Sequence, residues 1–223
     1  MKKYETVIFD LDGTLADTVA SIAYSANLTL EKFGYPKQPV DKFRYFAGDG
    51  VGELTRRCLA EVGDVEGKHY EDFLHLYRQY LSKYCMYQVK PFEGIPELIR
   101  EIGKRGVMRA VLSNKPHRQT QEVIGRLFTD GSFEFVQGQQ EGIPRKPDPT
   151  GALHLAAIAQ VSPEECLYIG DTNTDMKTGR GAGMHTVGVL WGFRDRKELQ
   201  KNKAEYLVSK PEEILNILEG RLS

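Results

Sequence analysis

Five short runs of β-branched and aromatic residues recur along this chain, and helical patterns separate most of them. The first run, residues 6–9, ends directly at Asp10. Such short apolar runs are typical of strands that are buried on both faces. Strands that alternate with helices favour a parallel sheet with helices on both sides. We therefore expect an α/β fold with a Rossmann-like, three-layer parallel sheet core. The later runs are residues 108–112, 133–136, 166–169 and 186–190.

One long segment, residues 16–83, breaks this alternation because it contains no strand-like run. Its apolar residues instead recur at helical spacing, which predicts at least three amphipathic helices. We expect a small all-helical cap domain over residues 16–83, inserted after the first strand, and a core domain built from residues 1–15 and 84–223. Ligands of open α/β sheets bind at the carboxyl ends of the strands, so such a cap would lie over the ligand site. The three apolar faces are Val19, Ile22, Ala23, Ala26 and Leu30; Val51, Leu54 and Cys58; and Tyr70, Phe73, Leu74 and Tyr77.

The charge balance of the 223 residues is nearly neutral, with 30 Lys and Arg against 31 Asp and Glu. A chain without a strong overall field is not expected to bind nucleic acid or an anionic membrane. No stretch approaches the ~20 apolar residues of a membrane span, and the N-terminus does not resemble a signal peptide. The three cysteines show no metal-ligand spacing, which is typical of reduced, buried thiols. We expect a cytoplasmic protein that is a monomer or a weak homodimer.

Polar residues gather where the expected strands end. Because all strands of a parallel sheet end at one edge, these side chains should converge there. Four carboxylates in one place cannot all stay ionised unaided, since like charges raise each other's pKa. A hard divalent cation resolves that conflict, and Mg²⁺ prefers such oxygen ligands. The converging residues are Asp10 and Asp12, Ser113, Asn114 and Lys115, Lys146, and Asp171 and Asp175.

Each of these groups also has a purely structural interpretation. Asp-x-Asp-Gly after a strand is often a polar turn, and Asp171 with Asp175 could complement a helix N-terminus. Ser113 could belong to a turn, and Lys146 could be a solvated loop residue. The joint occurrence of all four groups, each near a strand end, favours a functional site.

The same residues resemble the four motifs of the haloacid dehalogenase superfamily of phosphotransferases. The matching residues are Asp10-x-Asp12-x-Thr14, Ser113, Lys146 and Gly170-Asp171-x-x-x-Asp175. The resemblance covers nearly the whole chain, and the helical segment looks like that superfamily's small helical cap. An acid at position 12 favours the phosphatase branch.

That resemblance implies a role for each residue. Asp10 would be the nucleophile that forms an aspartyl-phosphate, and Asp12 the general acid and base. Asp10, Asp171, Asp175 and the backbone carbonyl of Asp12 would bind Mg²⁺. The donors that hold the transferring phosphoryl group would be Ser113, Asn114 and Lys146.

Softer patterns are similar to the phosphoglycolate phosphatase-like group, including residues 46–50, 113–117 and 187–193. A small phosphorylated metabolite would then be the substrate. In the cap, Arg44, Gly48 and Gly50 could bind a substrate anion, although a flexible loop with a solvated arginine explains them equally well. A pyrophosphatase, a nucleotidase or a sugar-phosphate phosphatase or mutase of the same superfamily remains an alternative. So does a phospho-accepting, receiver-like signalling domain.

Overall fold

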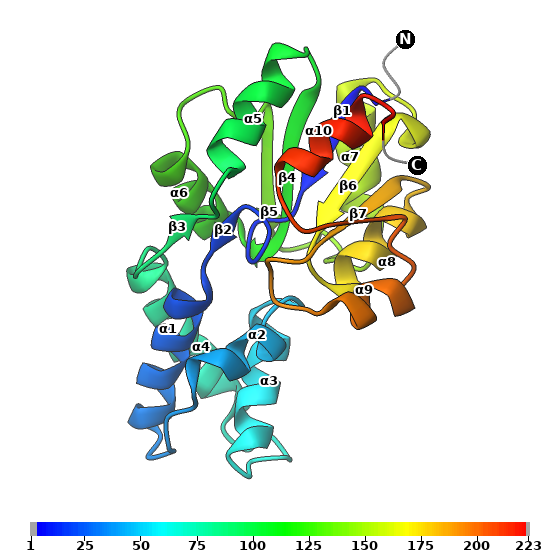
Figure 1. The fold of residues 1–223 in the computed structure, drawn as a ribbon. Helices are drawn as coiled ribbons and strands as arrows, with labels where there is room; N and C mark the ends of the chain where they lie inside the picture. Colours follow the sequence, from blue (N-terminus) through cyan, green and yellow to red (C-terminus); the bar gives the residue numbers. More distant parts are fainter. Residues whose placement is uncertain (1–3, 222–223) are drawn as a thin grey trace.

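A six-stranded parallel sheet forms the centre of the molecule, and the computed structural model describes residues 4–221 (Figure 1). The strand order is β5-β4-β1-β6-β7-β8. The central strand β1 pairs with β4 on one side and β6 on the other, and Phe9 lies opposite both Val111 and Ile169. This register brings the carboxyl ends of the three strands to one edge. The strands are β1 (Thr6–Phe9), β4 (Met108–Pro116), β5 (Phe135–Gln139), β6 (Cys166–Gly170), β7 (His185–Val189) and β8 (Tyr206–Val208).

Two hydrophobic clusters, one on each face of the sheet, hold the three layers together. Alternate residues of β1 serve the two faces, since Val7 and Phe9 join one cluster and Ile8 joins the other. Helices α5 (Ile95–Lys104), α6 (His117–Leu127) and α10 (Glu212–Leu218) cover the first face. Helix α7 (Thr150–Ala159) packs on the second face, and α8 (Asn173–Gly181) contacts β6 and β7. The short elements η2 (Pro163–Glu165) and α9 (Arg196–Lys201) complete the connections. The expected α/β fold class is confirmed.

Four α-helices follow β1 and pack together as a separate group, which we call the helical lobe. They are α1 (Val19–Lys32), α2 (Phe43–Phe46), α3 (Val51–Glu61) and α4 (Tyr70–Tyr84), with the 3₁₀ turn η1 (Val40–Lys42) before α2. The lobe has its own hydrophobic cluster, which contains Leu30, Phe43 and Phe73. Figure 1 shows it lying beyond the carboxyl end of β4. A two-stranded antiparallel ribbon, β2 (Ala16–Asp17) with β3 (Lys90–Pro91), joins the lobe to the sheet.

All five strand-like runs lie in or overlap strands of the sheet, and the three apolar faces lie on α1, α3 and α4. The short strands β2, β3 and β8 were not predicted. Ser209 and Glu212 have the spacing of a capping box, but they do not form one before the last helix. The helix begins after Pro211, and Ser209 N donates instead to Glu213 at 3.4 Å.

All three cysteines are buried free thiols. Among residues 4–221, no helix has the length and apolar character needed to cross a bilayer.

Candidate active site

Three aspartates meet at the carboxyl ends of β1 and β6. Asp10, Asp171 and Asp175 are all buried, and one carboxylate oxygen from each lies within 4.8 Å of the others. Asp10 directly follows β1, Asp171 directly follows β6, and Asp175 lies in the first turn of α8. Three of the four predicted acids therefore form one cluster, although Asp10 and Asp171 lie 161 positions apart in the sequence.

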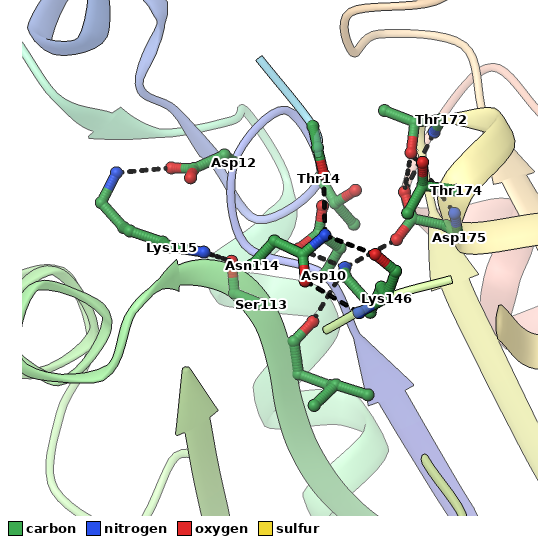
Figure 2. Close-up of polar contacts among 12 residues, drawn as sticks. Asp10, Asp12, Thr14, Ser113, Asn114, Lys115, Lys146, Thr172, Thr174 and Asp175 are labelled. Atoms are coloured by element: carbon green, nitrogen blue, oxygen red, sulfur yellow. Dashed lines mark hydrogen bonds and ion pairs between the residues drawn. The ribbon is translucent and has the colours of Figure 1, made fainter. Parts of the chain in front are cut away.

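Lys146 lies next to two of these aspartates, Asp10 and Asp175, as Figure 2 shows. Its Nζ is 2.9 Å from Asp10 Oδ1 and 2.8 Å from Asp175 Oδ1. It also donates a hydrogen bond to the carbonyl oxygen of Leu112 at 3.0 Å, which ties it to β4. A buried ammonium group is stable only with such partners. The predicted phosphate-binding lysine therefore lies beside the predicted nucleophile.

Burial and mutual repulsion shift the titration of these groups. Burial, together with Asp175 and Asp12, raises the pKa of Asp10 to about 7, although Lys146 opposes the shift. Burial and the two neighbouring aspartates raise the pKa of Asp171 well above its usual range. For Lys146, burial alone would lower the pKa, but Asp10 and Asp175 raise it well above the usual lysine value. Such shifted values are typical of functional sites.

The cluster is suited to a hard divalent cation. Its three carboxylates supply the oxygen ligands that Mg²⁺ takes, and Lys146 is the cation that lies beside two of them in this structure. Asp171 is fixed by a hydrogen bond of 3.0 Å from Thr14 Oγ1 and one of 2.6 Å from the Phe193 amide. It also lies against Gly13 and Gly192, where an added Cβ would approach within 2.3 Å of Asp171 atoms.

Asp12 points away from the three-aspartate cluster. Its Oδ1 accepts a hydrogen bond of 2.9 Å from Lys115 Nζ, and Figure 2 shows this pair on the opposite side of Asp10 from Asp175. Lys115 is almost completely buried, whereas Asp12 is partly exposed to the space in front of it. The sequence placed Lys115 among the residues expected to converge at the sheet edge but gave it no role.

Ser113 and Asn114 come from the end of β4. The Ser113 hydroxyl is buried at the site and accepts a hydrogen bond of 3.2 Å from the Lys115 amide. The Asn114 side chain exchanges two hydrogen bonds with the Lys146 backbone, at 2.9 and 3.0 Å. Its Nδ2 also donates to the Gly48 carbonyl at 3.1 Å. One amide therefore connects β4, the Lys146 loop and the helical lobe.

A small chamber of about 40 Å³ lies in front of Asp10, between the sheet edge and the helical lobe. A water molecule needs ~10–15 Å³ of such space, so the chamber admits a group of roughly phosphoryl size. Asp12, Ser113 and Asn114 line its sheet side. The lobe contributes mainly apolar side chains, namely Ile22, Val51, Leu54, Tyr77 and Leu81.

The three predicted substrate residues of the lobe are placed differently. Gly48 and Gly50 line the chamber, whereas Arg44 does not, because its Nη1 donates to the Gly192 carbonyl at 3.1 Å. Asp49, between the two glycines, turns away and accepts hydrogen bonds of 2.5 Å each from Thr174 and Arg57. Burial alone would raise the pKa of Asp49, but these two donors lower it below its ordinary value.

Sequence reasoning missed the contacts that hold the lobe against the sheet domain. Arg194, 7% exposed, donates to the carbonyl oxygens of Arg44 and Ala47. The neighbouring Phe193 packs into the hydrophobic cluster of the lobe. Nothing in the local sequence marks this arginine, because its partners are backbone carbonyls about 150 residues away.

The fold is a Rossmann-like α/β sheet, and the carboxylate cluster lies at the edge where ligands of such sheets bind. A model of the haloacid dehalogenase-like hydrolases matches residues 7–189, and the chain belongs to this family.

A phosphoglycolate phosphatase from Aquifex aeolicus is 27% identical over 216 residues, covering 97% of both chains. One from Pseudomonas putida is 29% identical, covering 91% of this chain and 75% of its own. A crystal structure from Lactobacillus delbrueckii subsp. bulgaricus, provisionally named a phosphoglycolate phosphatase, is 31% identical. It superposes with a TM-score of 0.89, covering 98% of this chain and 99% of its own.

Proposed function

We propose that this protein is a Mg²⁺-dependent phosphatase that hydrolyses small phosphate monoesters through an aspartyl-phosphate on Asp10. The observation that carries the proposal is the cluster of Asp10, Asp171 and Asp175, in which Lys146 contacts Asp10 and Asp175 and Asp10 lines a chamber of phosphoryl size. The names of the relatives make phosphoglycolate the first substrate to test. We infer that the helical lobe is a cap that closes over the chamber, because its apolar side chains line one wall.

The reaction would proceed in two displacements. An Asp10 oxygen attacks phosphorus while the bond to the leaving oxygen breaks, and Asp12 gives that oxygen its proton. A water molecule then attacks the aspartyl-phosphate and passes its proton to Asp12. The bond between phosphorus and the Asp10 oxygen breaks, which releases inorganic phosphate and restores the Asp10 carboxylate.

The remaining side chains stabilise and position the phosphoryl group. Lys146 and the donors at Ser113 and Asn114 would meet the negative charge of its oxygens. Asp10, Asp171, Asp175 and the Asp12 carbonyl would hold Mg²⁺, which supplies further charge stabilisation when it is bound. The apolar wall of the lobe would exclude bulk water during the transfer.

The test is release of inorganic phosphate from a panel of esters in the presence of Mg²⁺. The panel comprises phosphoglycolate, pyrophosphate, nucleoside monophosphates and hexose phosphates. We expect repeated turnover that chelation abolishes and added Mg²⁺ restores. A single equivalent of bound phosphate without turnover would instead indicate a receiver-like phospho-acceptor. Hydrolysis that persists after chelation would reject the proposed requirement for Mg²⁺.

A further inference from the structure

A second, larger cavity adjoins the catalytic chamber. This outer cleft has a volume of about 840 Å³ and lies between the helical lobe and the sheet domain. The two spaces are neighbours because the same residues border both, namely Gly50, Val51, Leu81, Asn114 and Pro116. A leaving group that is too long for the chamber would extend into the outer cleft.

Two arginines from different parts of the fold line the outer cleft. Arg78 comes from α4 in the lobe, and Arg145 comes from the loop that also carries Lys146. The Arg145 guanidinium reaches across to the lobe, where its Nη1 lies 3.7 and 3.8 Å from the Cβ positions of Gly50 and Gly52. A Cβ at either glycine position would only just contact the guanidinium, so the Arg145 side chain lies close against the lobe backbone.

Neither guanidinium has a carboxylate partner within residues 4–221, whereas several other surface arginines do have one. Arg100, for example, pairs with Glu97 at 2.8 Å, and Arg126 pairs with Glu122 at 3.0 Å. The outer cleft also contains one carboxylate, on the exposed Glu141, and the rest of its polar lining is neutral amides and a tyrosine. Its net charge is therefore positive, and both cations keep all their donors available.

The chamber itself offers no such cation to a leaving group. Of the residues that line it, only Lys115 is cationic, and it is paired with Asp12. A second acidic group on the substrate would therefore find its hydrogen-bond donors in the outer cleft. Guanidinium groups recognise carboxylate and phosphate through paired hydrogen bonds.

We propose that Arg78 and Arg145 form an anion subsite that binds a second acidic group on the leaving group of the substrate. This inference rests on the proposed phosphatase function and narrows its substrates to esters with an anionic leaving group. Because one arginine belongs to the lobe and the other to the sheet domain, such a substrate bridges the two parts.

The test compares esters of equal length with and without a terminal carboxylate. One pair is phosphoglycolate with ethyl phosphate, and the other is 4-carboxybutyl phosphate with pentyl phosphate. The measured quantity is the ratio of kcat/KM for the acid over that for the alkyl ester. We expect wild type to prefer the acid in at least one pair. Arg78→Gln and Arg145→Gln should each lower that ratio about tenfold, which is ~1.4 kcal/mol. The control Arg100→Gln, on the surface of α5, should leave the ratio unchanged.

A binding measurement separates this inference from the catalytic one. The same acids are titrated calorimetrically into Asp10→Asn, alone and combined with each arginine substitution. Weaker binding of the acid in the combined variants would support the subsite. Absence of ester hydrolysis by wild type would reject the phosphatase function, but it would leave this binding result in support of the subsite. Two results with active wild-type protein would overturn the subsite. One is a kcat/KM ratio that shows no preference for the acid in either pair, and the other is a preference that neither arginine substitution lowers.

Discussion

Lys115 Nζ lies 2.9 Å from Asp12 Oδ1, and this ion pair holds the proposed general acid and base at the edge of the catalytic chamber. The two residues come from the ends of different strands, β4 and β1. The lysine therefore fixes the direction of the Asp12 carboxylate relative to Asp10. We regard Lys115 as a positioning residue for proton transfer to the leaving oxygen.

Lys115→Met should lower kcat about tenfold for alkyl phosphates, because a general acid that is out of place protonates a poor leaving group inefficiently. The loss should be smaller for p-nitrophenyl phosphate, whose leaving group needs little protonation. Steady-state kinetics over a series of leaving groups measures the difference. Lys104→Met, at an exposed position of α5, is the control. An equal loss for every leaving group would reject the positioning role.

Asp10→Asn should abolish turnover and leave the protein folded, because an amide is a poor nucleophile of nearly the same size. Phosphate release and circular dichroism measure the two properties. Asp130→Asn, at an exposed position, should retain full activity. Wild-type activity in pure Asp10→Asn protein would show that another group attacks phosphorus.

Mg²⁺ binding should strengthen as the pH rises towards about 7. The raised pKa of Asp10 means that the metal-free folded protein binds a proton there more tightly than the unfolded chain does. The stability that protonated Asp10 contributes is therefore complete at low pH. It declines as the pH rises from the ordinary pKa of an aspartate to the raised pKa of about 7. Mg²⁺ replaces that proton, so the increase in Tm on adding Mg²⁺ should be larger at pH 8 than at pH 5.5. An equal increase at both values would contradict this linkage.

Gly192→Ala should reduce both stability and activity. The added Cβ would lie 2.3 Å from the Asp171 Cβ and 2.5 Å from the Gly13 carbonyl oxygen, so the loop or Asp171 must move. Overpacking of this kind destabilises by about 1–3 kcal/mol. Urea unfolding and phosphate release measure the effects. The matched change Gly125→Ala, on an exposed face of α6 with open space around it, should instead stabilise by ~0.5–1 kcal/mol. If Gly192→Ala had the stability and the activity of wild type, the space around Gly192 would have room for a methyl group.

Arg194→Met should weaken the attachment of the helical lobe. The substitution removes the hydrogen bonds to the carbonyl oxygens of Arg44 and Ala47, and hydrogen bonds from a charged donor contribute about 1.5–3 kcal/mol. We expect a higher KM and faster limited proteolysis within residues 43–50. Arg196→Met, at an exposed position of α9, is the control. Unchanged KM and proteolysis would mean that other contacts suffice to hold the lobe.

Features that depend on a local pattern could be predicted from the sequence. The runs at residues 6–9 and 166–169 are strands because their apolar residues are continuous, and Asp10 and Asp171 follow them directly. Because parallel strands end at one edge, the meeting of these acids followed from topology alone. The helical lobe was recognisable from its 3.6-residue periodicity.

Features that depend on distant partners could not be predicted in this way. Strand β8 is three residues long and is stabilised as a strand only by pairing with β7. The direction of Arg44 and the hydrogen bonds of Arg194 depend on how the lobe packs, and the pairing of Lys115 with Asp12 depends on how the ends of β4 and β1 meet. Sequence spacing does not encode these directions, because side-chain rotamers follow from tertiary contacts.

The ribbon of β2 and β3 has an evolutionary consequence. The chain leaves the sheet domain at Ala16 and returns at Pro91, and these two residues are paired neighbours. Everything between them can therefore change in length or sequence without altering the spacing of the strands that hold the catalytic acids. This arrangement would allow the substrate specificity to change during evolution through replacement of the segment between Ala16 and Pro91, while the catalytic residues of the sheet domain stay the same.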